Sequence, residues 1–342
     1  MRAAERTRLK AVKLAELLRG ARSLLVVMQD NPDPDSIASA VALRKIANAL
    51  GETQCSIVHG GRIGRGENRA MVQYLRLNLR PCSEIDFAKF DLVATVDTQP
   101  GTGNNCVPDG VIPDIVIDHH PFRRASKAAA VADVRSKYGA TSTILVEYLI
   151  ELGIPPDMTL ATALLFGIRS DTQDLGREAV RADIDAIDFL FPLANHRMLG
   201  EIQRGSVERP YFAMLTKALE NARVYGRSII TTLDTIDNPD MIGEIADLLL
   251  RDEDVIWTMC SGFYQGKLLI SIRSLDEDGR ADKIVRSVVA RKGAGGGHHS
   301  YAGGQIPLPE GTEAERRNLL KLIERRFLKA VGADDKESSR LV

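Results

Sequence analysis

Residues with carboxylate and imidazole side chains follow three short apolar runs in the first half of the chain. The runs are LLVVM (24–28), LVATV (92–96) and DIVI (114–117), and the side chains that follow them are Asp33, Asp35, Asp97, Asp118, His119 and His120. Carboxylate oxygen suits Mn²⁺ or Mg²⁺, and an added imidazole shifts the preference toward Mn²⁺ or a similar transition metal. One such aspartate could be only a turn or capping residue, but three strand ends of this kind together predict a metal site.

Two of these carboxylates lie beside prolines, in the segment NPDPDS. A proline biases the residue before it toward extended backbone, and in an extended segment residues i and i+2 point to the same side. We therefore expect Asp33 and Asp35 to face one point, just before a helix that begins at Ser36. Two like charges held in this way repel each other unless a cation lies between them. The alternative is a helix N-cap cluster, in which Asp and Ser are common.

Two further segments carry candidate functional residues. Asp171, in FGIRSDTQDL, follows an apolar helix and by itself could be a turn residue. In GAGGGHHSYAGG (293–304) the glycines let the backbone approach a ligand closely, and successive N–H groups can bind an anion. His298 would add a donor beside them, and Arg273 could hold a phosphate with its planar guanidinium. The alternative for the glycine run is a flexible loop between a helix and a strand.

A parallel sheet is the element that would bring these strand ends together. Up to residue 190, short apolar runs, among them CSIVH (55–59), alternate with helical patterns near 36–50, 66–77, 141–152 and 159–168. This alternation is typical of a parallel sheet covered on both faces, and ligands bind at the carboxyl ends of its strands. The rest of the chain predicts a smaller α/β unit. Its expected elements are a strand at 228–234, helices at 238–251, 281–291 and 312–331, and a hairpin turning at Gln265-Gly266.

Length and these patterns indicate about two domains in the 342 residues. We expect an α/β protein whose N-terminal domain, residues 1–190, is a doubly wound, mostly parallel sheet. A helical linker at 191–222 leads to a smaller α/β domain at 223–332, and a flexible polar tail follows at 333–342.

The charge of the chain is nearly balanced, with 45 Lys and Arg against 46 Asp and Glu, so any attraction for a polyanion must be local. Five arginines at 62–80 are interpreted as a solvated face. A second basic run at 121–137 begins at the proposed metal edge and could attract a polyanionic substrate; it contains Arg123, Arg124, Lys127, Arg135 and Lys137, against Asp133.

The four cysteines, Cys55, Cys82, Cys106 and Cys260, are scattered and form no CxxC pair. This argues against a zinc ribbon and against a disulfide scaffold, and it suits a reducing cytoplasm. The N-terminal segment predicts an amphipathic helix, not a signal peptide, and no run approaches the roughly 20 apolar residues of a membrane span. We expect a soluble cytoplasmic protein without a membrane partner.

Taken in order, these motifs resemble those of the DHH phosphoesterase superfamily. NPDPDSIASAVAL, VDTQP, VIDHH and GIRSDT resemble its four motifs, and GGGHHSYAGG with SIRS resembles the DHHA1 domain. The resemblance is greatest to the oligoribonuclease/pAp-phosphatase (nanoRNase) group within the RecJ-like proteins. It implies a phosphoesterase that acts on a short single-stranded oligonucleotide, a linear dinucleotide or a pAp-like nucleotide phosphate, and it is compatible with a homodimer.

The resemblance also implies a role for each matching residue. Two Mn²⁺ ions, or Mg²⁺ or another divalent metal in their place, would be bound by Asp33, Asp35, Asp97 as the bridge, His119 and Asp171. Asp118 would orient His119, and His120 would face the phosphate, so that His120, Asp97 and Asp118 form the catalytic set. The distal part of the substrate would lie in a cleft between the domains, against Arg273, Ser274, Gly295, Gly296, Gly297 and His298.

One position departs from the family pattern. A metal-binding histidine usually stands four residues before the first aspartate, and this chain has Gln29 there. Glutamine is a weaker, neutral ligand, so we expect lower affinity or a different preference at the first metal site. Two alternatives therefore stay open: a nucleotide-binding or regulatory protein with a weakened metal centre, and a polyphosphate or pyrophosphate hydrolase.

Overall fold

The structure, a computed structural model, describes residues 3–176, 179–309, 311–333 and 337–342. The chain divides after Ser206 into two compact units, each with its own sheet and its own buried apolar clusters. In the described ranges, no helix is long and apolar enough to cross a membrane.

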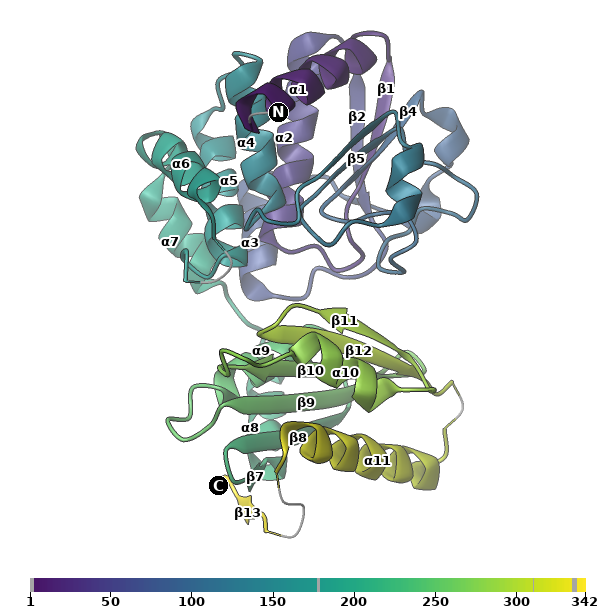
Figure 1. Cartoon of the computed structure of the whole chain (residues 1–342), viewed down its shortest axis with the longest axis vertical. Coiled ribbons are helices and arrows are strands. Elements are labelled where there is room, and N and C mark those ends of the chain that lie inside the picture. The colour runs from purple at the N-terminus through teal and green to yellow at the C-terminus, as the bar shows by residue number, and fades with distance from the viewer. Residues whose placement is uncertain (1–2, 177–178, 310, 334–336) are drawn as a thin grey trace. The chain divides into compact units, whose positions relative to one another are not determined.

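The first unit contains a parallel sheet, which confirms the predicted fold class. Its strands are β1 (Ser23–Val27), β2 (Gln54–His59), β3 (Arg80–Pro81), β4 (Leu92–Val96), β5 (Ile115–Asp118) and β6 (Val131–Val134). They lie in the order β3-β2-β1-β4-β5-β6, and every neighbouring pair is parallel. Figure 1 labels β1, β2, β4 and β5 of this sheet. The apolar runs noted in the sequence form β1, β2, β4 and β5, whereas β3 and β6 were not predicted.

The α-helices of this unit gather on one face of the sheet. They are α1 (Ala3–Arg19), α2 (Pro34–Leu50), α3 (Gly66–Tyr74), α4 (Thr141–Glu151), α5 (Met158–Asp171), α6 (Arg181–Leu190) and α7 (His196–Arg204). Successive side chains of a strand point to opposite faces, so Leu24 of β1 joins this helical core whereas Leu25 joins a smaller cluster on the other face. The short 3₁₀ helices η1 (Cys82–Glu84) and η2 (Phe87–Lys89) cover that second face.

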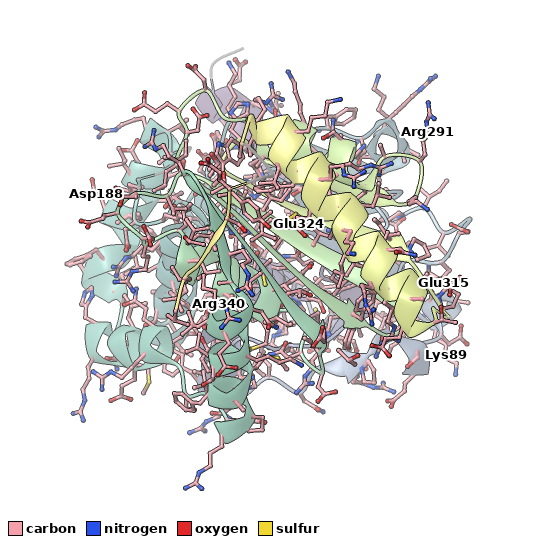
Figure 2. The ribbon with its side chains drawn as sticks, turned by 90° about the horizontal axis from the view of Figure 1, so that it is seen from below. Lys89, Asp188, Arg291, Glu315, Glu324 and Arg340 are labelled. Atoms are coloured by element: carbon pink, nitrogen blue, oxygen red, sulfur yellow. A yellow bond between two sulfur atoms is a disulfide. The ribbon has the colours of Figure 1, made fainter. Side chains whose placement is uncertain are left out.

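The second unit is a mixed sheet with helices on both faces. Its strands lie in the order β11-β12-β10-β9-β8-β7-β13. Among the described residues of this sheet, β8 and β9 form a parallel pair and the other neighbouring pairs are antiparallel. The strands are β7 (Arg223–Tyr225), β8 (Ser228–Thr235), β9 (Trp257–Tyr264), β10 (Lys267–Ser274), β11 (Ala294–Gly297), β12 (Tyr301–Pro307) and β13 (Ser339–Arg340). One face packs against α10 (Ala281–Val289) and α11 (Glu313–Val331), and Figure 2 shows α11 lying over the strands. The other face packs against α8 (Arg209–Asn221) and α9 (Met241–Leu249).

Several segments differ from the sequence expectation. α2 begins at Pro34, two residues before the predicted start. The glycine run forms the edge strand β11, paired with β12, and is not a loop. At the C-terminal end, β13 pairs with β7, and the N–H of Leu341 donates to the carbonyl of Ala222, so the expected flexible tail is ordered at these residues; 334–336 lie outside the described ranges. The segment expected as a linker divides between the units, with α7 in the first and α8 in the second.

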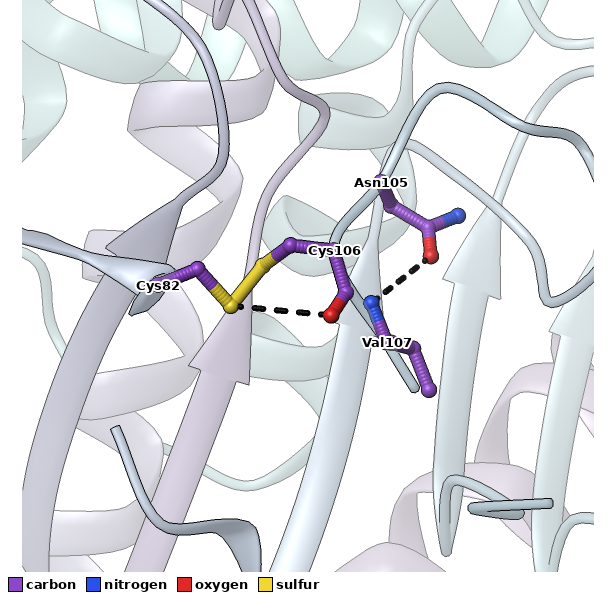
Figure 3. Close-up of a disulfide and its surroundings, with 4 residues drawn as sticks. All are labelled: Cys82, Asn105, Cys106 and Val107. Atoms are coloured by element: carbon purple, nitrogen blue, oxygen red, sulfur yellow. Dashed lines mark hydrogen bonds between the residues drawn. A yellow bond between two sulfur atoms is a disulfide. The ribbon is translucent and has the colours of Figure 1, made fainter. Parts of the chain in front are cut away.

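A disulfide joins Cys82 to Cys106 (Figure 3), whereas the scattered cysteines were interpreted as suited to a reducing cytoplasm. Cys82 lies in η1 at the edge of the sheet, and Cys106 lies in the loop that follows β4. Both belong to the small cluster on the second face. Their separation of 24 residues in sequence matches no motif, and only the fold brings them together. Cys55 and Cys260 are free thiols.

Candidate metal centre

The three polar segments noted in the sequence meet at one edge of the first sheet. β1, β4 and β5 are neighbours that run in the same direction, so the residues that follow them leave the sheet at the same edge. β2 follows β1 on one side, whereas β4 lies on its other side. The strand order therefore reverses at β1, and in open α/β sheets a ligand-binding crevice forms at such a point.

Five side chains at this edge form two overlapping groups that could hold a metal ion. Asp35, His119 and Asp171 form one group, and Asp97, His119 and His120 form the other; in each group the ligand atoms lie within 4.8 Å of one another. His119 belongs to both groups, because its Nε2 lies 2.9 Å from Asp171 Oδ2 and 3.6 Å from Asp97 Oδ1. Of the predicted ligands in the described ranges, Asp33 alone belongs to neither group, although its charge acts on Asp97.

Asp35 lies in the first turn of α2 and is buried. Its two carboxylate oxygens accept hydrogen bonds from the N–H groups of Thr141 and Ser142, each at 2.7 Å. These residues begin α4, where N–H groups have no partner within the helix and favour a negative charge. The prediction of two extended carboxylates is therefore wrong for Asp35. Asp33 is extended, and as the N-cap of α2 it accepts the N–H of Ser36 at 2.9 Å.

Asp171 reaches the site from the C-terminal end of α5. This helix packs closely against α2 because Gly167 has no side chain. A Cβ at position 167 would lie 2.8 Å from Ser142 Oγ and 3.1 Å from the Cα of Asp35. The GIRSDT segment therefore supplies both the close helix approach and the carboxylate.

Asp97 directly follows β4, and its carboxylate belongs to the group that contains His119 and His120. Its backbone has a φ of 58°, in the left-handed region that Asp and Asn tolerate better than most residues. Thr141 Oγ1 donates a hydrogen bond to its Oδ1 at 3.1 Å, and Gln29 Nε2 donates to its Oδ2 at 3.3 Å. Gln29, which stands where the family pattern has a histidine, therefore faces Asp97 and donates a hydrogen bond to it.

The buried carboxylates repel one another. Burial, together with the charge of Asp171, raises the pKa of Asp33 to about 6 and that of Asp35 to about 7. Burial and the charges of Asp33 and Asp35 raise the pKa of Asp97 well above its usual range. Burial opposes protonation of His119, but the hydrogen bond to Asp171 and the surrounding carboxylates raise its pKa to about 10. A bound cation, for which carboxylate and imidazole groups are suitable ligands, would relieve this repulsion.

Asp118 binds His120 directly, whereas the sequence predicted that it would orient His119. Asp118 Oδ1 lies 2.9 Å from His120 Nδ1 and accepts the His120 N–H at 3.2 Å. Burial favours the neutral carboxyl, but the hydrogen bond and charge of His120 outweigh it and lower the pKa of Asp118. His119 is held by its own contact, with Nδ1 3.1 Å from the carbonyl of Tyr138.

Gln99 is a site residue that the sequence did not reveal. It is fully buried, and its Nε2 donates to Asp118 Oδ2 at 2.6 Å and to the carbonyl of Pro121 at 3.2 Å. Its Oε1 accepts the N–H of Arg123 at 2.7 Å and the hydroxyl of Ser126 at 2.9 Å. One carboxamide thus holds both Asp118 and the loop that follows the two histidines. Its place in VDTQP, two residues after Asp97, was the one available signal.

The predicted substrate residues of the second unit lie around the end of β10. Arg273 Nε donates to Asp247 Oδ1, and its Nη1 donates to Ser271 Oγ at 2.6 Å. Ser274 is buried, and its Oγ accepts the N–H of Asp276 at 3.0 Å. Across the sheet, the ring of His298 stacks on Tyr301 at 4.7 Å between centroids. Gly295, Gly296 and Gly297 lie in β11.

The basic run at 121–137 does not form one surface. Arg135 is buried and its guanidinium binds Asp133 Oδ2 through Nε and Nη2, at 2.9 Å and 2.6 Å. It also binds Glu147 Oε2 at 2.5 Å. The proposed attraction of a polyanion is therefore wrong for Arg135, which is part of a buried ion-pair network. Arg123, Arg124 and Lys127 are exposed.

Two family models match this chain. The DHH family, N-terminal domain, matches residues 23–168, and the DHHA1 domain matches residues 226–329. The chain belongs to the DHH/DHHA1 family. Asp33, Asp35, Asp97 and the Asp118–His120 segment lie within the DHH match, and the glycine strand and Arg273 lie within the DHHA1 match.

Curated DHH/DHHA1 relatives cover most of this chain. A Methanocaldococcus jannaschii protein, MJ1633, is 33% identical over 320 residues, which span 92% of this chain and 65% of that protein. The cyclic-di-AMP phosphodiesterase PdeA of Listeria monocytogenes is 25% identical over 330 residues, spanning 91% of this chain and 49% of PdeA. The chain thus matches about half to two thirds of the length of these relatives.

Solved structures share the fold. An exopolyphosphatase-related protein from Bacteroides fragilis superimposes with a TM-score of 0.74 at 15% identity, covering 94% of this chain and 96% of that one. RecJ from Thermus thermophilus, solved in complex with Mn²⁺, gives a TM-score of 0.52 at 18% identity, covering 94% of this chain and 55% of RecJ. At these identities the likeness shows the fold of the DHH/DHHA1 protein and not its substrate.

Proposed function

We propose that this DHH/DHHA1 protein is a metal-dependent phosphoesterase that hydrolyses short oligonucleotides, linear dinucleotides or pAp-like nucleotide phosphates. The observation that carries the proposal is the pair of overlapping carboxylate–histidine groups at the strand-order reversal of the sheet. The phosphodiesterase activity named for PdeA, on a cyclic dinucleotide, supports nucleotide chemistry. The family itself supports hydrolysis of phosphate esters.

The residues present fit divalent cations. Asp35, Asp97, His119 and Asp171 would supply carboxylate and imidazole ligands, with Asp33 close by, and this mixture favours Mn²⁺, with Mg²⁺ as the second choice. Manganese in the RecJ structure supports the same choice. Two bound ions would generate a hydroxide nucleophile and stabilise the charge that develops on the phosphate. Asp97, which Thr141 and Gln29 hold by hydrogen bonds, would be the ligand shared by the two ions.

His120 is the residue we assign to the substrate phosphate. Its side chain is about one-third exposed, whereas that of His119 is buried, so His120 can reach a bound molecule. The carboxylate of Asp118 fixes the ring through Nδ1 and favours the form with a proton there. When Nε2 is protonated as well, it can donate a hydrogen bond to a phosphate oxygen or give its proton to the leaving oxygen. Arg273, Ser274, His298 and the glycines of β11 are proposed to bind the distal part of the substrate.

The test is hydrolysis of a labelled RNA dinucleotide and of pAp, with and without Mn²⁺. Asp97→Asn is the matched variant, because Asn also tolerates the left-handed backbone and retains the size of the side chain. We expect Mn²⁺-dependent release of mononucleotide or inorganic phosphate by the wild type, and a loss of at least about a thousandfold in the variant. Hydrolysis that persists in Asp97→Asn would refute the metal assignment.

A nucleotide-binding protein with a weakened metal centre is the second candidate, and Gln29 favours it. Its amide binds Asp97 where the family pattern has a metal-binding imidazole. Metal content separates the two candidates: two ions per chain, measured by elemental analysis after dialysis, support the enzyme. In Gln29→His we expect metal affinity to rise roughly 10- to 100-fold. Unchanged affinity in a titration calorimeter would show that position 29 does not limit metal binding.

A further inference from the structure

Exposed cations gather on the two helices that cover one face of the second sheet. α10 and α11 both pack into the same apolar cluster, and their outer surfaces carry no large exposed apolar side chain among the described residues. We call the exposed cations of these helices and of the turn after α10 the α10–α11 basic face: Lys283, Arg286, Arg291, Lys292, Lys321, Arg325 and Lys329.

Acidic side chains do not neutralise this face. Between 281 and 333, within the described residues, Asp282, Glu313, Glu315 and Glu324 are the acids. Asp282 pairs with Arg280, and its charge also interacts with that of Arg286. Glu313 pairs with Arg317, and Glu315 caps the N-terminus of α11. Glu324 accepts a hydrogen bond from the hydroxyl of Tyr225, and Figure 2 shows it on the opposite side of α11 from Arg291. In a chain of net charge −1, the face is therefore a local concentration of positive charge.

The two helices hold the cations in fixed relation to each other. Arg326 Nη1 donates to the carbonyls of Val288 and Ala290, at 2.8 Å and 3.1 Å, and so ties α11 to the end of α10. Ile323 and Phe327 anchor the inner side of α11 in the core. Lys321, Arg325 and Lys329 recur every four residues, which places them along one side of the helix at a rise of about 6 Å per step.

We propose that the α10–α11 basic face binds the phosphate backbone of a single nucleic-acid strand, an interaction separate from catalysis at the metal centre. Rows of Lys and Arg along a helix are the usual electrostatic footprint of such binding. The face lacks exposed aromatic residues for base stacking, so binding is sequence-tolerant and falls steeply with salt. An anionic membrane fits less well, since a helix that lies on lipid inserts an apolar side, and here that side is in the core. The strand as ligand rests on the proposed function.

The test is binding of the full chain to a fluorescein-labelled 20-nucleotide oligouridylate, measured by anisotropy at several salt concentrations. The variant combines Arg286→Gln, Lys321→Gln, Arg325→Gln and Lys329→Gln. The control combines Arg227→Gln, Arg251→Gln, Lys267→Gln and Arg340→Gln, exposed positions elsewhere in the same unit with the same change in charge. We expect the face variant to bind more than tenfold more weakly, with a salt slope reduced by about 0.7 for each lost contact, and the control to change less than about threefold, as general charge effects do.

Equal weakening in both variants, or none in either, would refute the proposal. Binding to phosphatidylserine vesicles that the face variant loses while it retains oligouridylate would refute it as well. Dinucleotide hydrolysis separates this inference from the proposed function, because four substitutions outside the metal centre should leave it unchanged. A wild type that binds the strand through this face without hydrolysing a dinucleotide would uphold the binding and refute the enzyme.

Discussion

Gln99 controls the geometry of the site although it performs no chemistry itself. Its amide nitrogen fixes Asp118, and its carbonyl oxygen fixes the loop through Arg123 and Ser126. Asp118 in turn holds the ring of His120. A carboxamide can donate on one side and accept on the other without carrying a charge.

Gln99→Glu separates these two functions. Glutamate retains the acceptor for Arg123 and Ser126 but replaces the donor to Asp118 by an oxygen, so the hold on His120 is lost. We expect kcat to fall roughly 10- to 100-fold, as the loss of a buried hydrogen bond worth about 1–3 kcal/mol implies, with little change in KM. Steady-state kinetics on the dinucleotide check this. Ser126→Ala is the control, since it weakens the loop contact alone; an equal loss of kcat in both variants would contradict the role of Asp118.

The raised pKa values of Asp33 and Asp35 predict how pH affects stability without metal. Their folded values, about 6 and about 7, lie above the unfolded value of about 3.9. The folded state therefore binds more protons between pH 4 and 7, and the free energy of unfolding falls as pH rises through this window. In EDTA we expect the Tm of the wild type to fall relative to that of Asp33→Asn, which retains the cap on Ser36 but cannot ionise. Mn²⁺ should abolish the difference; parallel pH profiles in EDTA would disprove the coupling.

At the scale of elements, the start of α4 determines where Asp35 and Asp97 lie. Thr141 binds both carboxylates, through its N–H and its hydroxyl. The turn before it is held by Asp183 of α6, which accepts the N–H groups of Gly139 and Val180 and the hydroxyl of Thr143. Asp183 is fully buried, so these bonds satisfy a charge that water cannot reach.

Asp183→Ala should therefore destabilise the first unit by about 3 kcal/mol, since it leaves three buried donors without their acceptor. Urea unfolding measures the change. Asp185→Ala on the same helix is the control, because Asp185 is exposed and its 2.8 Å ion pair with Arg181 should contribute less than about 1 kcal/mol. Equal effects of the two substitutions would show that Asp183 does not anchor the turn.

The sequence predicted the elements whose pattern is local. β1, β4 and β5 are apolar runs that end in polar residues, and α5 is a continuous apolar helix, so these were found close to their observed bounds. Gln99 was missed because its partners lie 19 to 27 residues away and its own neighbourhood gives no periodic signal. Asp35 was misplaced because prolines favour extended backbone in the residue before them, whereas Pro34 is itself well suited to begin a helix, as it does in α2.

Residues that act across the fold were the least predictable. Arg135 looked like a surface cation in a basic run, and only tertiary contacts reveal that it is buried against Asp133 and Glu147. The glycine run lacks side chains that indicate a strand, yet it pairs with β12 along the sheet edge. The disulfide likewise follows from the approach of η1 to the loop after β4.

At the scale of the whole molecule, the two units have separate cores. The buried apolar clusters of the first unit contain residues up to Ile202, and those of the second begin at Ala218. The isolated segment 207–342 should consequently fold by itself. We expect cooperative thermal unfolding of this fragment by circular dichroism, together with retention of oligouridylate binding. A fragment without a cooperative transition would show that the second unit requires the first.

The left-handed backbone of Asp97 has a consequence for laboratory evolution. At a φ of 58° glycine and asparagine fit without a charge, whereas aspartate adds another negative group to a buried acidic cluster. A library randomised at position 97 and selected only for heat resistance in chelator should enrich glycine and asparagine. The same library selected for turnover with Mn²⁺ should retain aspartate. Selection for heat resistance and selection for turnover would then favour different residues at position 97. Stabilised variants of this protein should therefore be screened with the metal present.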